Sequence, residues 1–313
     1  MNTDGGISAA PLAGHRALFL SWIGFHGRSL DLAAALGAEC RFVATGTLTN
    51  RRTAPLRHLW QAVTTAVVLL RTRPRILVVM APPADLVLVG LVWRALSRGR
   101  LGVDCHSKAV LGRPLSARLA ARADAAVVTL PELAEQLPHA IVLHDPPVAP
   151  VDAAEHEEVV FPASWYDDEP IDELLAAAAA LPQVRFAITG RAPARLRVPA
   201  NVRLTGYLPR EEYAQLIAGA RLVLALTTRE FTMQRAAYEA IGAGRPVVAS
   251  ETRALRGYLG DAAVYAGDLP AAITTALHRR DDLVRAAMRV RDVEHEAFQQ
   301  GLRALAEALR GGV

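Results

Sequence analysis

Two carboxylates in the rear half of the chain give the strongest chemical signal of the sequence. Glu230 and Glu239 are nine positions apart, and a helix over 232–243 is predicted to follow a buried strand over 222–226. Nine steps along one continuous helix would place the two side chains on opposite faces. Both can therefore face one ligand only if Glu230 lies in the loop before the helix.

The predicted start of this helix suits a phosphate. Free amide groups around residues 231–235 would point at an anion. Glu239, further along, could accept hydrogen bonds from the two hydroxyls of a ribose. The alternative is structural: Glu239 pairs with Arg235 one turn earlier, and Glu230 is solvated.

A histidine and a lysine follow another predicted strand, 101–105. The imidazole of His106 can hydrogen-bond a sugar hydroxyl, and the ammonium group of Lys108 offers a compact charge to a phosphate. Asp104 would point the opposite way in the strand, as a structural residue or as the base of an inverting reaction. A lone histidine is more often structural, so that alternative stays open for His106.

A third candidate stretch, 21–37, joins a strand to a helix through a turn that contains glycine. Gly27 lets the backbone approach a ligand closely, and His26 and Arg28 are expected to project toward that ligand. Ser29 is the expected cap of the following helix. Glycines are common at strand-to-helix turns, so a purely structural turn is the alternative.

These residues need strands and helices to position them, and the chain supplies a repeated alternation of the two. Strands apolar on both faces need cover on both sides, and their alternation with helices indicates parallel sheets. The predicted strands are 17–22, 41–44, 76–80, 101–105, 125–129, 141–143, 159–162, 185–189, 202–204, 222–226, 247–250 and 264–265. The predicted helices are 29–36, 57–71, 85–97, 115–122, 132–136, 171–181, 210–218, 232–243 and 253–259.

The length of 313 residues and an apolar content of 52% favour two folded domains. A proline-rich stretch followed by acidic residues, 144–157, is the expected boundary. We therefore expect an α/β protein of two Rossmann-like, doubly wound domains that face each other across a cleft, over 1–150 and 151–313. Two amphipathic helices are expected over 281–310, packing back on the first domain.

The rear half also resembles a known class. The run 239–250, EAIGAGRPVVAS, is similar to the second half of a motif in the GT-B glycosyltransferases that include bacterial phosphatidylinositol mannosyltransferases and sucrose synthases. The first glutamate of that motif falls on Phe231 here, with Glu230 one residue early. Patterns such as SWYDDEP at 164–170 and LTTRE at 226–230 resemble a branch of short bacterial glycosyltransferases.

The resemblance implies a transfer of a hexose-type sugar from a UDP- or GDP-linked donor, retaining and independent of metal, with no cofactor. By resemblance Glu239 holds the donor ribose, and His106 faces the sugar. Glu230, or the backbone around 231–233, contacts the sugar and the diphosphate. The class usually places an arginine and a lysine against the diphosphate, and this chain lacks them; Arg191, Arg229 and Arg235 are the available replacements. The full donor set is Glu239, Gly27, Arg191, Thr228, Arg229, Phe231, Thr232, Met233 and Arg235; His106 and Glu230 are catalytic candidates, and His26, Arg28 and Lys108 are acceptor candidates.

Charge and composition limit the partners. Residues 1–150 carry 16 Lys and Arg against 9 Asp and Glu, a balance of +7, which favours an anionic partner. No nucleic-acid signature is found, and the two cysteines indicate neither a disulfide framework nor a metal site. The apolar helices flanked by arginines in the first half either line a core or meet an acidic membrane and a lipid-linked acceptor. The expected location is the cytoplasm, including the inner face of the membrane.

Two other functions stay open. A nucleotide-sugar 2-epimerase of the same architecture would also place glutamate and histidine between two domains. A non-catalytic partner that activates another glycosyltransferase would explain the missing arginine and lysine. The acceptor class also stays open between a glycan, a lipid-linked glycan and a small molecule.

Overall fold

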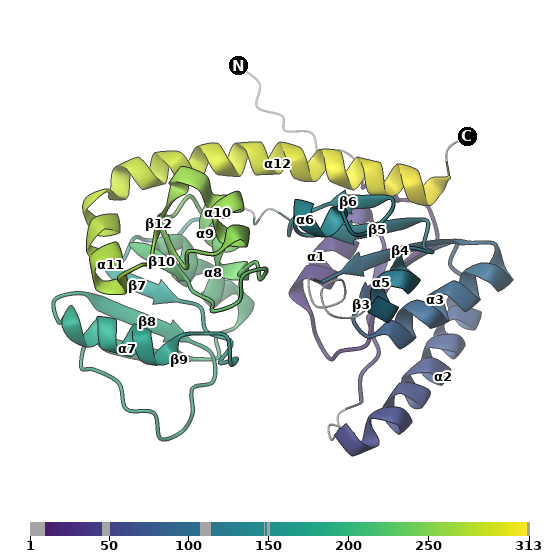
Figure 1. Ribbon diagram of the computed structural model, residues 1–313, viewed down its shortest axis with the longest axis horizontal. Helices are drawn as coiled ribbons and strands as arrows, with labels where there is room; N and C mark the ends of the chain where they lie inside the picture. The colour runs from purple at the N-terminus through teal and green to yellow at the C-terminus, as the bar shows by residue number, and fades with distance from the viewer. Residues whose placement is uncertain (1–9, 46–50, 107–113, 147, 149–150, 312–313) are drawn as a thin grey trace. The chain divides into compact units, whose positions relative to one another are not determined.

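The computed structural model describes residues 10–45, 51–106, 114–146, 148 and 151–311. The chain divides into two compact units (Figure 1). Met1–Pro146 together with Ala297–Val313 form the first unit, and Pro147–Glu296 form the second. The chain thus passes from one unit to the other twice, once at Pro146 and once inside its last helix.

The first unit contains a six-stranded sheet in which every pairing is parallel, in the order β2-β1-β3-β4-β5-β6. Residues such as Phe19, Val78 and Val127 are fully or almost fully buried, as expected for strands covered on both faces. The strands are β1 (Ala17–Ser21), β2 (Glu39–Phe42), β3 (Ile76–Ala81), β4 (Arg100–Cys105), β5 (Ala125–Val128) and β6 (Ala140–Val142). The helices are α1 (Gly27–Leu36), α2 (Ala54–Thr72), α3 (Ala84–Ser97), α5 (Pro114–Ala120) and α6 (Pro131–Ala134), with a 3₁₀ turn at Arg51–Thr53.

The second unit repeats this architecture, with all pairings parallel in the order β12-β11-β10-β7-β8-β9. Its core lies on both sides of the sheet, around residues such as Val223 on one face and Leu224 on the other. The strands are β7 (Glu158–Phe161), β8 (Arg185–Thr189), β9 (Val202–Gly206), β10 (Leu222–Ala225), β11 (Val247–Ala249) and β12 (Ala263–Tyr265). The helices are α7 (Ile171–Ala180), α8 (Arg210–Gly219), α9 (Arg235–Gly242), α10 (Arg253–Leu259) and α11 (Leu269–His278).

Two helix predictions are wrong. The tail is one helix, α12 (Arg280–Arg310), rather than two, because no proline or glycine cap interrupts its apolar stripe; Gly301 lies against Leu143 instead of ending the helix. The helix expected from Thr232 begins at Arg235 and ends at Gly242. Residues 232–234 therefore belong to the loop after β10.

The end of α12 belongs to the core of the first unit. Phe298, Leu302, Leu305 and Leu309 are buried and pack in one cluster with β1, β3 and β5. Gly102 of β4 lies against Leu309, where an added Cβ would be 3.3 Å from a methyl group of that leucine. The last helix thus closes a core that begins near residue 12.

Candidate functional site

The carboxyl ends of the strands contain two points at which the strand order reverses. In the first unit the chain runs from β1 outward to β2 and returns to β3 on the other side of β1. In the second unit it runs from β7 to β8 and β9 and returns to β10 on the other side of β7. Open parallel sheets bind ligands at such points. The candidate sites are therefore the carboxyl ends of β1 and β3, with the adjacent β4, in the first unit and of β7 and β10 in the second.

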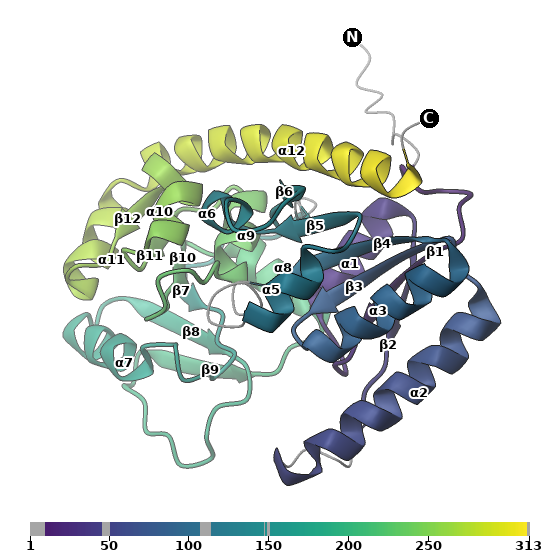
Figure 2. The same ribbon diagram turned by 45° about the vertical axis from the view of Figure 1, so that its right-hand side comes forward.

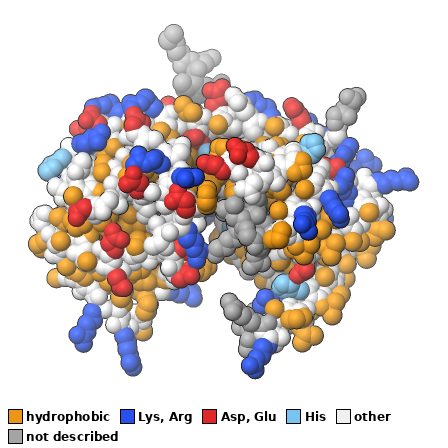
Figure 3. Space-filling model, in the orientation of Figure 1, with side chains coloured by type: hydrophobic (Ala, Val, Ile, Leu, Met, Phe, Trp, Pro, Cys, Tyr) orange, Lys and Arg blue, Asp and Glu red, His pale blue; other side chains and the backbone are white. Residues whose placement is uncertain are grey.

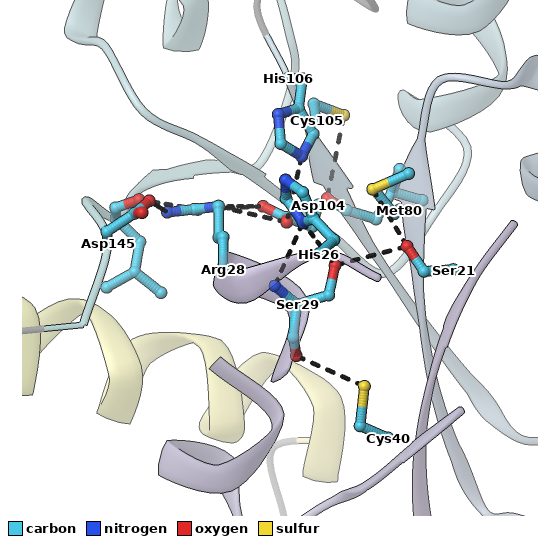
Figure 4. Close-up of polar contacts among 12 residues, drawn as sticks. Ser21, His26, Arg28, Ser29, Cys40, Met80, Asp104, Cys105, His106 and Asp145 are labelled. Atoms are coloured by element: carbon cyan, nitrogen blue, oxygen red, sulfur yellow. Dashed lines mark hydrogen bonds and ion pairs between the residues drawn. The ribbon is translucent and has the colours of Figure 1, made fainter. Parts of the chain in front are cut away.

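A buried ion network lies behind the segment that follows β1 (Figure 4). Arg28 donates to Asp104 Oδ1 through Nε (3.1 Å) and Nη2 (2.9 Å), to Asp145 through Nη1 (2.8 Å), and to the Leu143 carbonyl through Nη2 (2.9 Å). The side chains of Arg28 and Asp104 are only 4% and 1% exposed. Burial opposes both charges, but Arg28 lowers the pKa of Asp104, and the two aspartates raise the pKa of Arg28. Both groups of the pair therefore stay ionised.

This network corrects two predictions for the loop after β1. Arg28 does not project toward a ligand, because Asp104 and Asp145 enclose its guanidinium inside the unit. Ser29 does not cap the helix: α1 begins at Gly27, and Nδ1 of the preceding His26 accepts a bond from the Ser29 amide (3.3 Å). Of the two roles considered for Asp104, the structural one is observed.

His26 and His106 lie together beside this network (Figure 4). Their ring centroids are 4.8 Å apart, and their planes are inclined by 67°. Burial, followed by the neighbouring His106, lowers the pKa of His26 to about 4. Burial also lowers the pKa of His106, although Asp104 opposes that shift. Both rings are neutral at pH 7 and act there as hydrogen-bonding groups rather than as cations.

One nitrogen of this histidine pair, Nε2 of His106, is buried. His106 Nε2 forms no hydrogen bond within the described part of the chain, and Asp104 Oδ2 is 3.8 Å from it. Gly27 is the first residue of α1, directly after His26. The structure thus brings together His26, Gly27 and His106, whereas Lys108 lies outside the described residues.

In the second unit a buried aspartate holds the loop that follows β10. Asp168 Oδ2 accepts a bond from Thr227 Oγ1 (3.0 Å), and the Asp168 carbonyl accepts one from the Thr228 amide (2.8 Å). Arg229 forms ion pairs with Asp167 (2.6 Å) and Asp168 (3.4 Å). The acidic residues after β7 therefore position the loop and compensate the charge of Arg229.

Glu169 stabilises the segment after β7 through hydrogen bonds within that segment. Its carboxylate accepts bonds from the amides of Ser164 (2.8 Å) and Trp165 (2.7 Å), and burial raises its pKa. Gly190, directly after β8, has a φ of +82°, and a Cβ added there would be 2.3 Å from the carbonyl oxygen of Ala163. Only glycine permits this close approach of the two segments.

Glu239 has internal partners in this structure. Its side chain is 10% exposed, Oε1 accepts a bond from Arg235 Nε (2.8 Å), and Oε2 accepts one from the Tyr213 hydroxyl. Burial, and then the Glu239 carboxylate, raises the pKa of Tyr213 well above its usual value, so that this hydroxyl stays a donor. The structural alternative, a pair between Glu239 and Arg235, is present.

The other predicted residues of this loop lie between β10 and α9. Glu230 is 46% exposed, and its Oε1 accepts a bond from the Arg253 amide at the start of α10 (2.7 Å). Phe231 and Thr232 are half-buried, and Met233 packs against the core of the unit. Glu230 thus lies before α9, as the two-glutamate argument requires, and it also caps a neighbouring helix.

Arg191 differs from the other two candidate cations of the second unit. Arg229 and Arg235 are bound by carboxylates, whereas the guanidinium carbon of Arg191 lies 5.6 Å from the centre of the Tyr207 ring. No ion pair joins Arg191 to a carboxylate within the described residues. Among the three arginines it is the one whose charge the described carboxylates leave uncompensated.

The described residues contain no group of three or more His, Cys, Asp or Glu side chains arranged to hold a metal ion. Cys40 and Cys105 are both free. Over the same residues, no helix is both long and apolar enough to cross a bilayer.

Residues 156–280 match the model of the family described as glycosyl transferases group 1. This range extends from just before β7 to the start of α12, and it contains every candidate residue of the second unit. The second unit carries a group 1 glycosyltransferase domain. No protein of curated function matches the chain by sequence.

Solved structures of other glycosyltransferases share the complete fold. HepE from Anabaena, in complex with UDP-glucose, is 17% identical with a TM-score of 0.71, over 92% of this chain and 98% of HepE. Sucrose-phosphate synthase from Thermosynechococcus elongatus is 16% identical with a TM-score of 0.67, over 94% and 96%. The lipopolysaccharide outer core galactosyltransferase WaaB is 13% identical with a TM-score of 0.56, over 95% and 99%. The predicted fold class, GT-B, and the predicted enzyme class, a glycosyltransferase, are confirmed.

The residues that hold the candidates in place are not among those predicted from the sequence. Asp145, Asp168 and Tyr213 each bond to a candidate residue, and Glu169 bonds to the backbone of the segment after β7. The run Asp167–Glu169 lies where the resemblance leads one to expect an arginine and a lysine. A signal was nevertheless present, because acidic residues at the carboxyl end of a strand can accept bonds from loop amides and hydroxyls.

Proposed function

We propose that the chain transfers a hexose-type sugar from a nucleoside diphosphate donor to a hydroxyl of its acceptor. The match of residues 156–280 to group 1 glycosyl transferases carries this proposal. HepE has been solved in complex with UDP, with UDP and glucose, and with UDP-glucose, which supports a UDP-linked hexose as the first donor to test. A GDP-linked donor is the second.

The donor side of the proposal uses the carboxyl ends of β7, β8 and β10. Glu239 accepts the ribose hydroxyls once Arg235, 40% exposed and on the same face of α9, swings away from it. Arg191 takes the diphosphate, because it is the candidate cation without a carboxylate partner in the described residues. The amides at the start of α9 and the loop over 228–233 complete the phosphate contacts. Glu230 stays a candidate for the sugar.

Catalysis in this proposal is mainly positioning and electrostatic stabilisation of the leaving diphosphate. His106, whose side chain is 30% exposed, supplies a neutral imidazole to a sugar hydroxyl. Asp104 is enclosed by Arg28 and is 1% exposed, so it is unsuited to remove a proton from an acceptor. This favours retention over an inverting reaction based on Asp104. We also propose that no metal takes part, which a metal chelator tests directly: activity should survive it.

The acceptor remains a proposal of three classes, a glycan, a lipid-linked glycan or a small molecule. His26 and Gly27, and the segment that contains Lys108, are the proposed acceptor contacts of the first unit. A peripheral contact with an acidic membrane would suit the lipid-linked class. The cytoplasm, including the inner face of the membrane, stays the proposed location.

The test separates ligand binding by Glu239 from its structural role. We expect one of UDP, GDP, TDP and CDP to raise the melting temperature of the wild-type protein. Glu239→Gln should abolish that rise, whereas Tyr213→Phe should lower the melting temperature of the free protein and keep the rise. An equal rise in all three proteins would refute the ribose assignment. Product analysis with a labelled nucleotide sugar then separates transfer from 2-epimerisation, which would leave a changed donor and no transferred sugar.

A further inference from the structure

Helix α2 packs on its unit through a mostly polar face, whereas an ordinary amphipathic helix packs through its apolar face. Its buried stripe is Gln61, Thr65 and Leu69, two of which are polar. The opposite stripe is apolar and exposed, and spans roughly 100° of the helix surface. Its members are Leu56, Leu59, Trp60, Val63, Val67 and Leu70.

The polar side chains of the buried stripe of α2 form hydrogen bonds with the rest of the unit. Gln61 donates to the carbonyls of Trp22 (3.0 Å) and Val43 (2.8 Å), and Thr65 Oγ1 accepts a bond from the indole of Trp22 (2.8 Å). These bonds fix the rotation of α2 about its axis. The outward direction of its apolar stripe is therefore built into the fold.

Helix α3 lies beside α2 and extends the apolar surface (Figures 1 and 2). Leu88, Val92 and Leu96 recur every four residues and are 50%, 52% and 82% exposed. A hollow of about 1190 Å³ opens between the two helices toward their carboxyl ends, lined by apolar side chains of both. We name the exposed stripes of α2 and α3 and this hollow the α2–α3 face. A contiguous apolar surface of this kind on a folded unit marks an interaction site.

Positive charge gathers around the hollow of the α2–α3 face (Figure 3), whereas Asp85, the acidic residue of α3, lies beside His58 at the other end of the two helices. The residues that line the hollow include six arginines and no Asp or Glu, and residues 54–72 contain no acidic residue. Arg16, Arg73, Arg75 and Arg98 take part in no ion pair within the described parts of the unit. Apolar side chains inside a rim of uncompensated arginines complement a surface that is anionic outside and apolar beneath.

We propose that the first unit docks on an anionic lipid bilayer through the α2–α3 face. The apolar stripes enter the boundary between headgroups and acyl chains, and the arginines bind the lipid phosphates. A second copy of the chain fits less well, because a symmetric pairing would bring the same arginine rims together.

The docked helix would also connect the membrane to the candidate site. Trp22 follows β1 directly and precedes the loop that carries His26, and both Gln61 and Thr65 bond to Trp22. The first turns of α2 follow β2, so they lie at the carboxyl edge of the sheet, where that loop lies. The first turns of α2 would therefore bring the bilayer toward the edge that we assign to the acceptor, while the arginines of the hollow lie at the opposite, amino edge of the sheet, before β1 and β3.

The test is co-sedimentation of the full chain with vesicles of phosphatidylcholine alone and of phosphatidylcholine with phosphatidylglycerol. We expect binding to the anionic vesicles only, weakened by added salt. The pair Arg73→Gln and Arg98→Gln should weaken it roughly thirtyfold, at about 1 kcal/mol for each arginine near the surface. The pair Arg195→Gln and Arg197→Gln makes the same change of charge on exposed residues of the second unit and should leave binding unchanged.

The apolar stripe is tested separately. Leu59→Gln with Val63→Gln should abolish vesicle binding, while Leu115→Gln, an exposed position of α5, should not. Trp60, 45% exposed, should shift its fluorescence to shorter wavelength on anionic vesicles, and Trp60→Phe should remove that shift. Nucleotide-induced stabilisation should be the same in every variant, which keeps this test independent of the donor site.

Three results would overturn the proposal. They are equal binding to neutral and anionic vesicles, equal binding by the face variants and their controls, and a solution dimer that Leu59→Gln with Val63→Gln converts to a monomer. The last result would assign the face to a second copy of the chain.

Discussion

Replacing Asp104 by Asn tests the buried ion network, because the change keeps the shape of the side chain and removes its charge. Asp104 accepts bonds from both Nε and Nη2 of Arg28 and is 1% exposed. Breaking a buried pair by removing one partner costs about 3–5 kcal/mol. Asp145 still compensates Arg28 in the variant, so we expect the lower end, about 3 kcal/mol.

The assay is urea unfolding at pH 7 followed by tryptophan fluorescence in a Trp165→Phe background. Of the four tryptophans, only Trp165 lies in the second unit, so the remaining signal reports on the first. Asp145→Asn is the matched control: its side chain is 12% exposed and accepts one bond from Arg28, and we expect a loss of about 1 kcal/mol.

A second comparison distinguishes the removal of one charge of the pair from the removal of both. Arg28→Met combined with Asp104→Leu removes both charges and fills the space with apolar groups, which is often neutral for a buried pair. This double variant should be more stable than Asp104→Asn alone. If Asp104→Asn costs no more than Asp145→Asn, the buried network does not hold α1 in place, and our explanation of the burial of Arg28 fails.

Three further predictions follow from the two units. Because the pKa of His26 falls to about 4 in the folded chain, the unfolded chain binds the extra proton first as the pH decreases. Stability should therefore fall between about pH 6.5 and pH 4, by at most about 3 kcal/mol; a His26→Gln variant with the same slope in urea titrations would contradict this. Arg191→Gln should weaken nucleotide binding about tenfold in calorimetry through the loss of a charge-assisted contact, with Arg195→Gln unchanged; equal affinities would remove Arg191 from the donor site. Gly190→Ala should lower stability by about 1–3 kcal/mol because of its left-handed backbone and the contact with Ala163, and a melting temperature equal to that of the wild type would show that the segment relaxes freely.

The strands could be predicted from the sequence because each carries its own signal. All twelve predicted strands are present, with ends that differ by a few residues. A buried parallel strand is apolar on both faces, so a short apolar run such as 222–226 predicts a strand even when its neighbouring strands are not known. Helix ends are weaker signals, and for this reason the start of α9 at Arg235 and the continuity of α12 were missed.

The candidate site could be predicted only where its partners are local. Arg235 and Glu239 are one helical turn apart, so their ion pair could be predicted from the sequence as the alternative to ribose binding. Arg28 and Asp104 are separated by 76 residues, and their meeting depends on which strand lies beside which. No spacing rule predicts such a contact. For this reason the sequence suggests that Arg28 faces a ligand, whereas the structure holds it inside the unit.

The order of synthesis has a consequence for the first unit. Phe298, Leu302, Leu305 and Leu309 are synthesised after the whole second unit, and they fill a core whose other members precede that unit in the chain. Each fully buried apolar side chain of this size contributes about 1.5–3 kcal/mol. The first unit therefore cannot complete its interior until residues 298–309 are synthesised, whereas residues 147–296 are a contiguous piece. A fragment that stops at Glu296 should expose this unfilled interior and aggregate.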